Sequence, residues 1–186
     1  MKTTLFGVAV IVVLVLAVVG GRSSSAQDKQ DRYTLQVPGG LAFSEIRGYE
    51  QWQVVGPSLT EAANVIRVIL ANPVMIKAYQ EGIPGNGKPF PDGSVIVKIE
   101  WVKKKNPVSP YFVEVPDTLE SVSFMEKDSK RFPDTSGWGY AQFLYDSASD
   151  TFKPYGSDSS FGKKVCYQRH TLVTGRDYIF TNYTPR

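Results

Sequence analysis

The chain has 186 residues, of which 42% are hydrophobic and 21% are charged, a composition that suits one globular domain with a buried core. Its formal net charge is +3, and it falls to +1 if residues 1–26, which contain Lys2 and Arg22 but no acid, are removed. A nearly neutral domain lacks the basic surface typical of nucleic-acid binding, so we exclude DNA and RNA as partners.

The first 26 residues have the layout of a secretory signal peptide. Lys2 precedes an apolar run over residues 5–19, and the small residues at 24–26 offer a cleavage site after Ala26. The run is shorter than the roughly 20 residues of a membrane-spanning helix, so an uncleaved membrane anchor is the second interpretation. We therefore predict a secreted or periplasmic protein.

The next segment, residues 27–40, is polar and ends in Pro38-Gly39-Gly40, so we predict a linker that leads into a folded domain at 41–186. Within the domain, residues 64–71 (NVIRVILA) are rich in Val and Ile and predict a buried strand. Asn72-Pro73 then supplies an N-cap and a first helical proline, which predicts a short helix over Pro73 to Glu81.

Residues 94–103 (SVIVKIEWVK) form the clearest predicted strand. Alternation directs the apolar side chains of Val95, Val97, Ile99 and Trp101 to one face, which we expect to meet the core. Lys98 lies on the opposite face together with Ile96 and Glu100. Taken alone, this pattern predicts that Lys98 and Glu100 are surface charges, because lysine is seldom buried without a partner.

Further elements follow towards the C-terminus. We predict strands over residues 111–115, 119–125, 138–145 and 177–183, a polar loop over 146–160, and a short helix around 166–170. The predicted fold is an α+β domain built on an antiparallel sheet of about five or six strands with a few short helices.

The only cysteine and the only histidine, Cys166 and His170, lie four residues apart and would share one face of a helix. Three kinds of site would use this pair: a thiol nucleophile with an imidazole base, a zinc site completed by carboxylates, or a haem attachment site. The haem motif Cys-x-x-Cys-His has this spacing, with Arg169 in place of its second cysteine. The alternative without function is a buried cysteine near a surface histidine.

Several other short motifs recur in one known family in the same order. They are Arg47-Gly48-Tyr49-x-x-Trp52, Phe90-Pro91-Asp92-Gly93-Ser94, Lys127 to Phe132 (KDSKRF), Gly137-Trp138-Gly139-Tyr140 and Asp177 to Thr181 (DYIFT). With them the chain resembles the cytochrome P-460 family and the related beta-type cytochromes c-prime over residues 43–183. The resemblance implies an antiparallel-sheet domain that binds one c-type haem and forms a homodimer, with His170 as the proximal iron ligand.

Two positions refine what the resemblance implies. Arg169 departs from the family pattern, so haem c would be attached by a single thioether bond through Cys166. A haem-free descendant that acts as a binding or structural domain is therefore an alternative. Lys98 matches the lysine that is crosslinked to haem in hydroxylamine-oxidising relatives, so we expect it beside the haem.

The function that we predict follows from the number of iron ligands. With one histidine, a sixth iron ligand would have to be Met75, Met125, a lysine, a tyrosine or water. We expect a five-coordinate iron instead, and its open position favours ligand binding over pure electron transfer. In the loop before Cys166, Phe161 would give an apolar distal face suited to nitric oxide or another small diatomic gas. Asp158 would instead give a proton acceptor suited to hydroxylamine oxidation. We expect haem, one of these small molecules and a redox partner protein as partners.

Overall fold

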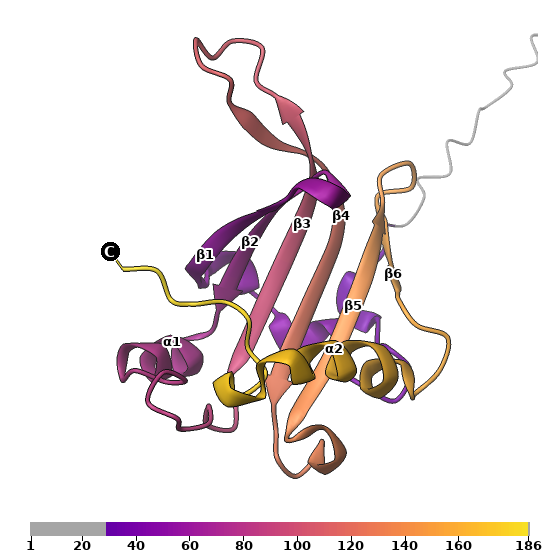
Figure 1. Cartoon of the computed structure of the whole chain (residues 1–186). Helices are drawn as coiled ribbons and strands as arrows, with labels where there is room; N and C mark the ends of the chain where they lie inside the picture. The colour runs from indigo at the N-terminus through magenta and orange to yellow at the C-terminus, as the bar shows by residue number, and fades with distance from the viewer. Residues whose placement is uncertain (1–28, 186) are drawn as a thin grey trace, which may run out of the picture.

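A computed structural model describes residues 29–185 and has one antiparallel sheet of six strands in sequential order (Figure 1). The predicted α+β fold with five or six strands is therefore confirmed. The predicted signal peptide, residues 1–26, lies outside the described residues. The strands are β1 (Gln53–Thr60), β2 (Val65–Ala71), β3 (Val95–Lys105), β4 (Glu114–Lys127), β5 (Trp138–Asp146) and β6 (Thr151–Pro154).

In the described part of the chain, two short α-helices accompany the sheet, α1 (Pro73–Gln80) and α2 (Gln168–His170), and a π-helical segment, Gly162–Tyr167, leads directly into α2. The predicted cap of α1 is present, because the Asn72 Oδ1 atom accepts hydrogen bonds from Met75 N at 3.0 Å and Val95 N at 3.1 Å. The asparagine thus ties the start of α1 to the start of β3. Within residues 29–185, no helix is long and apolar enough to cross a membrane.

One face of the sheet carries the main core. Val95, Val97 and Ile99 of β3 are buried there, as their alternation predicted. Phe43, from the segment before β1, lies at the centre of this core and is fully buried. Its ring contacts the rings of Phe143 and Phe152 at centroid distances of 4.9 and 5.1 Å.

The segment predicted as a linker, residues 27–40, packs on this core over its described part. It contains a 3-10 turn, Arg32–Thr34, and an isolated bridge between Gln36 and Ala42. Val37 is buried in the core and Leu35 packs against it. Apolar side chains in an otherwise polar segment explain this packing.

The opposite face of the sheet is covered by α1 and by the C-terminal segment, and Figure 1 shows α2 crossing in front of β4 and β5 near one end. Ile96, Met125 and Tyr140 of the central strands are buried beneath these elements. Further along the same face lies a polar row that includes Lys98 and Glu100. This face holds the candidate site.

The prediction of a closing strand over residues 177–183 is wrong, and two strands were missed. Asp177 and Tyr178 have φ angles of 46° and 65°, which are incompatible with an extended strand. The missed strand β1 contains Gly56-Pro57, which reads as a turn but is tolerated at the edge of a sheet. The other missed strand, β6, has only four residues within the predicted loop.

Strands β3 and β4 continue beyond the sheet as a hairpin arm, residues 103–116, which projects at the top of Figure 1. The predicted strand at 119–125 falls entirely in β4, whereas only the last two residues of the predicted strand at 111–115 belong to it. At the tip of the arm, the Phe112 side chain is fully exposed. The arm therefore adds no large side chain from its tip to either core.

Replacing Phe43 by alanine should lower the free energy of unfolding by about 3–5 kcal/mol, because it leaves a cavity among the packed rings. Urea unfolding followed by circular dichroism measures the change. Phe112→Ala is the matched control and should leave the free energy of unfolding unchanged, since its ring is exposed. Equal destabilisation by the two variants would contradict the assignment of the core.

Candidate cofactor-binding site

The π-helical segment and α2 place Cys166 and His170 over the second face of the sheet, and both residues are partly buried. Lys98 of β3 lies within electrostatic range of both, since its charge acts on the pKa of the Cys166 thiol and of the His170 imidazole. The structure thus brings these three residues from distant parts of the sequence to one region. Cys166 and Tyr167 also pack against the buried cluster under this face.

His170 is held in one orientation by the chain that follows it. Its Nδ1 atom lies 2.6 Å from the backbone oxygen of Tyr178. A carbonyl oxygen can only accept, so Nδ1 carries the proton and donates it, which leaves the lone pair on Nε2. Metal-ligating histidines are oriented in this way by a hydrogen bond from their other ring nitrogen.

Two aromatic rings cover the imidazole. The ring of Phe180 lies at 4.9 Å and the ring of Tyr140 at 5.3 Å from the His170 ring, measured between centroids. The resulting burial lowers the pKa of His170, although its hydrogen bond to the Tyr178 oxygen acts in the opposite direction. The imidazole is therefore neutral near pH 7, as a metal ligand must be.

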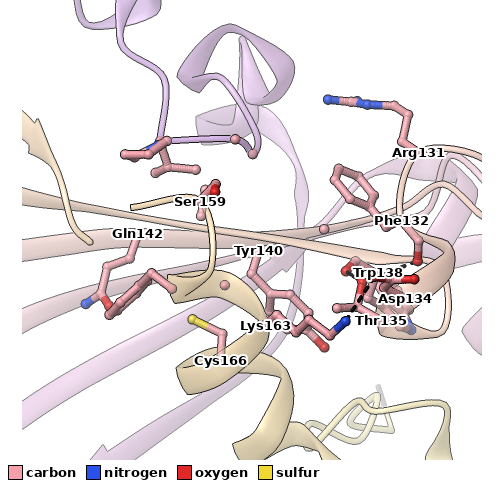
Figure 2. A pocket seen from close by; sticks show the side chains of 18 of the residues that line it. Arg131, Phe132, Asp134, Thr135, Trp138, Tyr140, Gln142, Ser159, Lys163 and Cys166 are labelled. Atoms are coloured by element: carbon pink, nitrogen blue, oxygen red, sulfur yellow. Dashed lines mark hydrogen bonds and ion pairs between the residues drawn. The ribbon is translucent and has the colours of Figure 1, made fainter. Parts of the chain in front are cut away.

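Cys166 lines a cavity of about 360 Å³ between β5, the π-helical segment and the loop around Asp134. Figure 2 shows the lining residues, including Tyr140 and the ion pair between Lys163 and Asp134. Burial raises the pKa of the Cys166 thiol and favours its protonated form, which weakens the thiolate-nucleophile hypothesis. No cluster of three or more metal-ligating side chains is found in residues 29–185, so the zinc hypothesis gains no support.

Phe161 and Asp158, the two distal-face candidates, both line this cavity. The Phe161 ring packs edge-on against Tyr155 at 5.0 Å, and Gly156 allows its approach, because a Cβ there would lie 2.8 Å from the ring. The Asp158 carboxylate accepts hydrogen bonds from Ser160 N and Oγ, which lower its pKa. Asp158 is exposed and committed to a local turn, whereas Phe161 forms part of the cavity wall.

Lys98 belongs to a polar cluster that the sequence pattern did not reveal. Its Nζ atom lies 2.8 Å from Glu100 Oε2, and Arg67 Nε lies 2.6 Å from Glu100 Oε1. Ser121 Oγ donates to Glu100 Oε2 at 2.8 Å. Burial raises the pKa of Glu100, but the hydrogen bonds and charges of these neighbours bring it below its usual value. The prediction of a solvated surface pair is wrong for Glu100, which is only 7% exposed.

Two buried hydroxyl groups near these residues have no hydrogen-bond partner among the described residues: Tyr140 Oη and Ser123 Oγ. Tyr140 contacts His170, and Ser123 lies opposite Lys98 in the sheet. Burial raises the pKa of Tyr140, so its hydroxyl stays protonated and is available as a donor. Buried polar atoms normally have partners, so this pair of orphan groups fits a site that receives a polar molecule.

Residues 46–181 match the Cytochrome P460 family, a range that contains Lys98, Cys166 and His170. No curated protein matches the chain significantly.

In the haem-free protein, the imidazole of His170 should titrate below the ordinary histidine pKa of about 6.5. Phe180→Ala should raise this pKa towards the ordinary value by admitting water. In the wild type, the lowered pKa means that the folded chain binds the proton less readily than the unfolded chain does. The free energy of unfolding should therefore fall as the pH drops from about 6.5 to the lower folded-state pKa. NMR titration of the only histidine tests both statements, and a pKa above about 6.5 would contradict them.

Proposed function

Because the chain belongs to the cytochrome P460 family, we propose that it is a secreted or periplasmic c-type haem protein whose five-coordinate iron binds small ligands such as nitric oxide. The observation that carries the proposal is the orientation of His170. Its Nδ1 donates to the Tyr178 oxygen, so Nε2 is free to ligate iron beside the only thiol of the chain.

The residues of the site fit haem. His170 supplies the imidazole ligand, Cys166 supplies one thioether bond, and the unpartnered hydroxyls of Tyr140 and Ser123 supply polar contacts. Arg169, which stands in place of the second cysteine, is exposed and cannot form a second thioether bond. When bound, the haem iron would supply a Lewis-acidic centre for a diatomic gas.

The surrounding side chains favour ligand binding over proton transfer. Phe161 gives the cavity beside Cys166 an apolar wall, and the rings of Tyr140 and Phe180 pack against the imidazole. Asp158, the candidate proton acceptor, is engaged by Ser160. In the thiol-lined cavity, the chain therefore offers an aromatic surface rather than a free general base.

In this proposal no second side chain would ligate the iron, so one position would remain for a small molecule. The two methionines of the described chain, Met75 and Met125, are buried within the packed cluster beneath the site. Neither methionine would reach the iron without repacking of this cluster. A homodimer and a redox partner protein follow from the family resemblance and belong to the proposal.

A second candidate function is hydroxylamine oxidation with Lys98 crosslinked to haem. It is supported by the electrostatic coupling of Lys98 to both Cys166 and His170. The Lys98 amine is engaged by Glu100 in an ion pair and is therefore not free to react with haem. For this reason we rank this function below gas binding. A haem-free binding or structural domain is the third candidate.

Protein made with a working cytochrome c maturation system should carry one covalent haem that survives acid–acetone extraction, and Cys166→Ala should release it. His170→Ala should lose the normal ferrous spectrum. Intact mass and visible spectra measure both effects. Arg169→Cys is the control, because it completes the motif and should shift the pyridine haemochrome band to shorter wavelength. Matured protein without haem would contradict the proposal in favour of the haem-free domain.

Nitric oxide should bind the ferrous protein and change its Soret band, and Lys98→Ala should keep this binding within about twofold if the lysine is only a neighbour of the haem. Lys104→Ala is the matched control, because Lys104 lies on the same strand but in the arm. A haem peptide that contains both Lys98 and Cys166 would instead make hydroxylamine oxidation the leading function.

A further inference from the structure

A buried ion pair lies beneath the segment that orients His170. Lys127, at the end of β4, and Asp177, after α2, are joined by contacts of 2.8 and 3.0 Å from Nζ to Oδ1 and Oδ2. Their side chains are only 6% and 10% exposed. A pair so deeply buried is costly unless every remaining hydrogen-bonding position is filled.

The surroundings fill those positions. Asp177 Oδ2 accepts a hydrogen bond from Phe90 N at 2.8 Å. Lys127 Nζ donates to the backbone oxygen of Ser136 at 3.0 Å and lies 5.0 Å from the centre of the Trp138 ring. The two charges therefore connect the end of β4, the turn before β5 and the chain after α2.

The backbone at this point is strained and needs an anchor. Asp177 and Tyr178 are consecutive non-glycine residues with φ angles of 46° and 65°. Such conformations persist only when the surrounding structure holds them. The carboxylate of Asp177 is held by three hydrogen bonds, so the anchor acts on the first of the two residues.

Lys127 contacts both Asp177 and Ser136, and these two residues hold the backbone and the side chain of Tyr178. Its backbone follows Asp177 directly, and its hydroxyl accepts a hydrogen bond from Ser136 Oγ at 2.8 Å. Ser136 is also the residue whose backbone oxygen receives Lys127 Nζ. The Tyr178 carbonyl, which accepts the proton of His170 Nδ1, is thus fixed by one ammonium group through two routes.

We propose that Lys127 and Asp177 are positioning residues for His170, and that their ion pair fixes the Tyr178 carbonyl so that the imidazole keeps its proton on Nδ1 and its lone pair on Nε2. The inference rests on the proposed function only where it concerns iron, because Nε2 is the atom that would ligate it. The hydrogen bond itself is a property of the chain without haem.

The test uses the full mature chain labelled with ¹⁵N-histidine, which gives signals from one imidazole because the chain has one histidine. In the haem-free wild type at pH 8, we expect nearly all molecules to carry the proton on Nδ1. In Lys127→Met/Asp177→Gly, the Nδ1–H population should fall at least about twofold, because the carbonyl is no longer held. Glycine tolerates the backbone conformation at 177, and removing both charges avoids an unpaired buried ion.

Asp117→Asn is the matched control, because Asp117 forms an exposed ion pair with Lys104 in the arm. It should leave the imidazole signals unchanged. If the double variant fails to fold, Lys127→Met/Asp177→Asn takes its place, since the asparagine keeps an acceptor for Phe90 N and no unpaired buried charge remains. A smaller shift in the same direction is expected. A folded variant of either kind that keeps the wild-type signals would overturn the inference.

In the haem-loaded protein, the double variant should have a higher midpoint potential than the wild type, because an imidazole without its Nδ1 hydrogen bond is a weaker donor to iron. An unchanged potential would count against the inference. If the protein takes up no haem, the proposed function fails, while the imidazole signals still decide whether Lys127 and Asp177 position His170. The two failures are therefore distinguishable.

Discussion

The alternation of side chains along β3 is the constraint on which the rest of the structure depends. Val95, Val97 and Ile99 enter the main core, and every residue between them must face the other way. Lys98 and Glu100 are therefore fixed on the face that Cys166 and His170 approach. A shift of one residue in the pairing of β3 would exchange the two faces and remove both the core and the site.

The polar cluster on this face illustrates how a sheet can bury charge. Glu100 has Arg67 opposite it on β2 and Ser121 opposite it on β4, so the cross-strand register supplies two of its three partners. Lys98 supplies the third from two residues away on the same strand. The Glu100 carboxylate can be buried because side chains at fixed positions on the adjacent strands supply its hydrogen bonds and opposite charge.

Local patterns predicted the parts of the fold that depend on neighbours in sequence. The alternation of β3, the Asn72 cap and the spacing of Cys166 and His170 are all visible within ten residues. The contact between Arg67 and Glu100 was not predictable, because it depends on strand register. The role of the Tyr178 carbonyl was hidden as well, since a backbone oxygen has no signature in sequence. The sequence pattern around Asp177 predicts a strand, whereas the residue has a left-handed conformation and pairs with Lys127, fifty residues earlier, a contact that no local pattern contains.

The sequential order of the strands has a consequence for how the domain assembles. Each strand pairs with the one made just before it, so most of the sheet closes short loops and forms from local contacts. The chain after α2 differs, since Tyr79 Oη meets Thr181 O across 102 residues and Thr184 meets Val55 across 129. Closing such long loops costs more entropy, so this segment docks late. The carbonyl that orients His170 therefore comes into place after the sheet has formed, and until then the imidazole is free to turn.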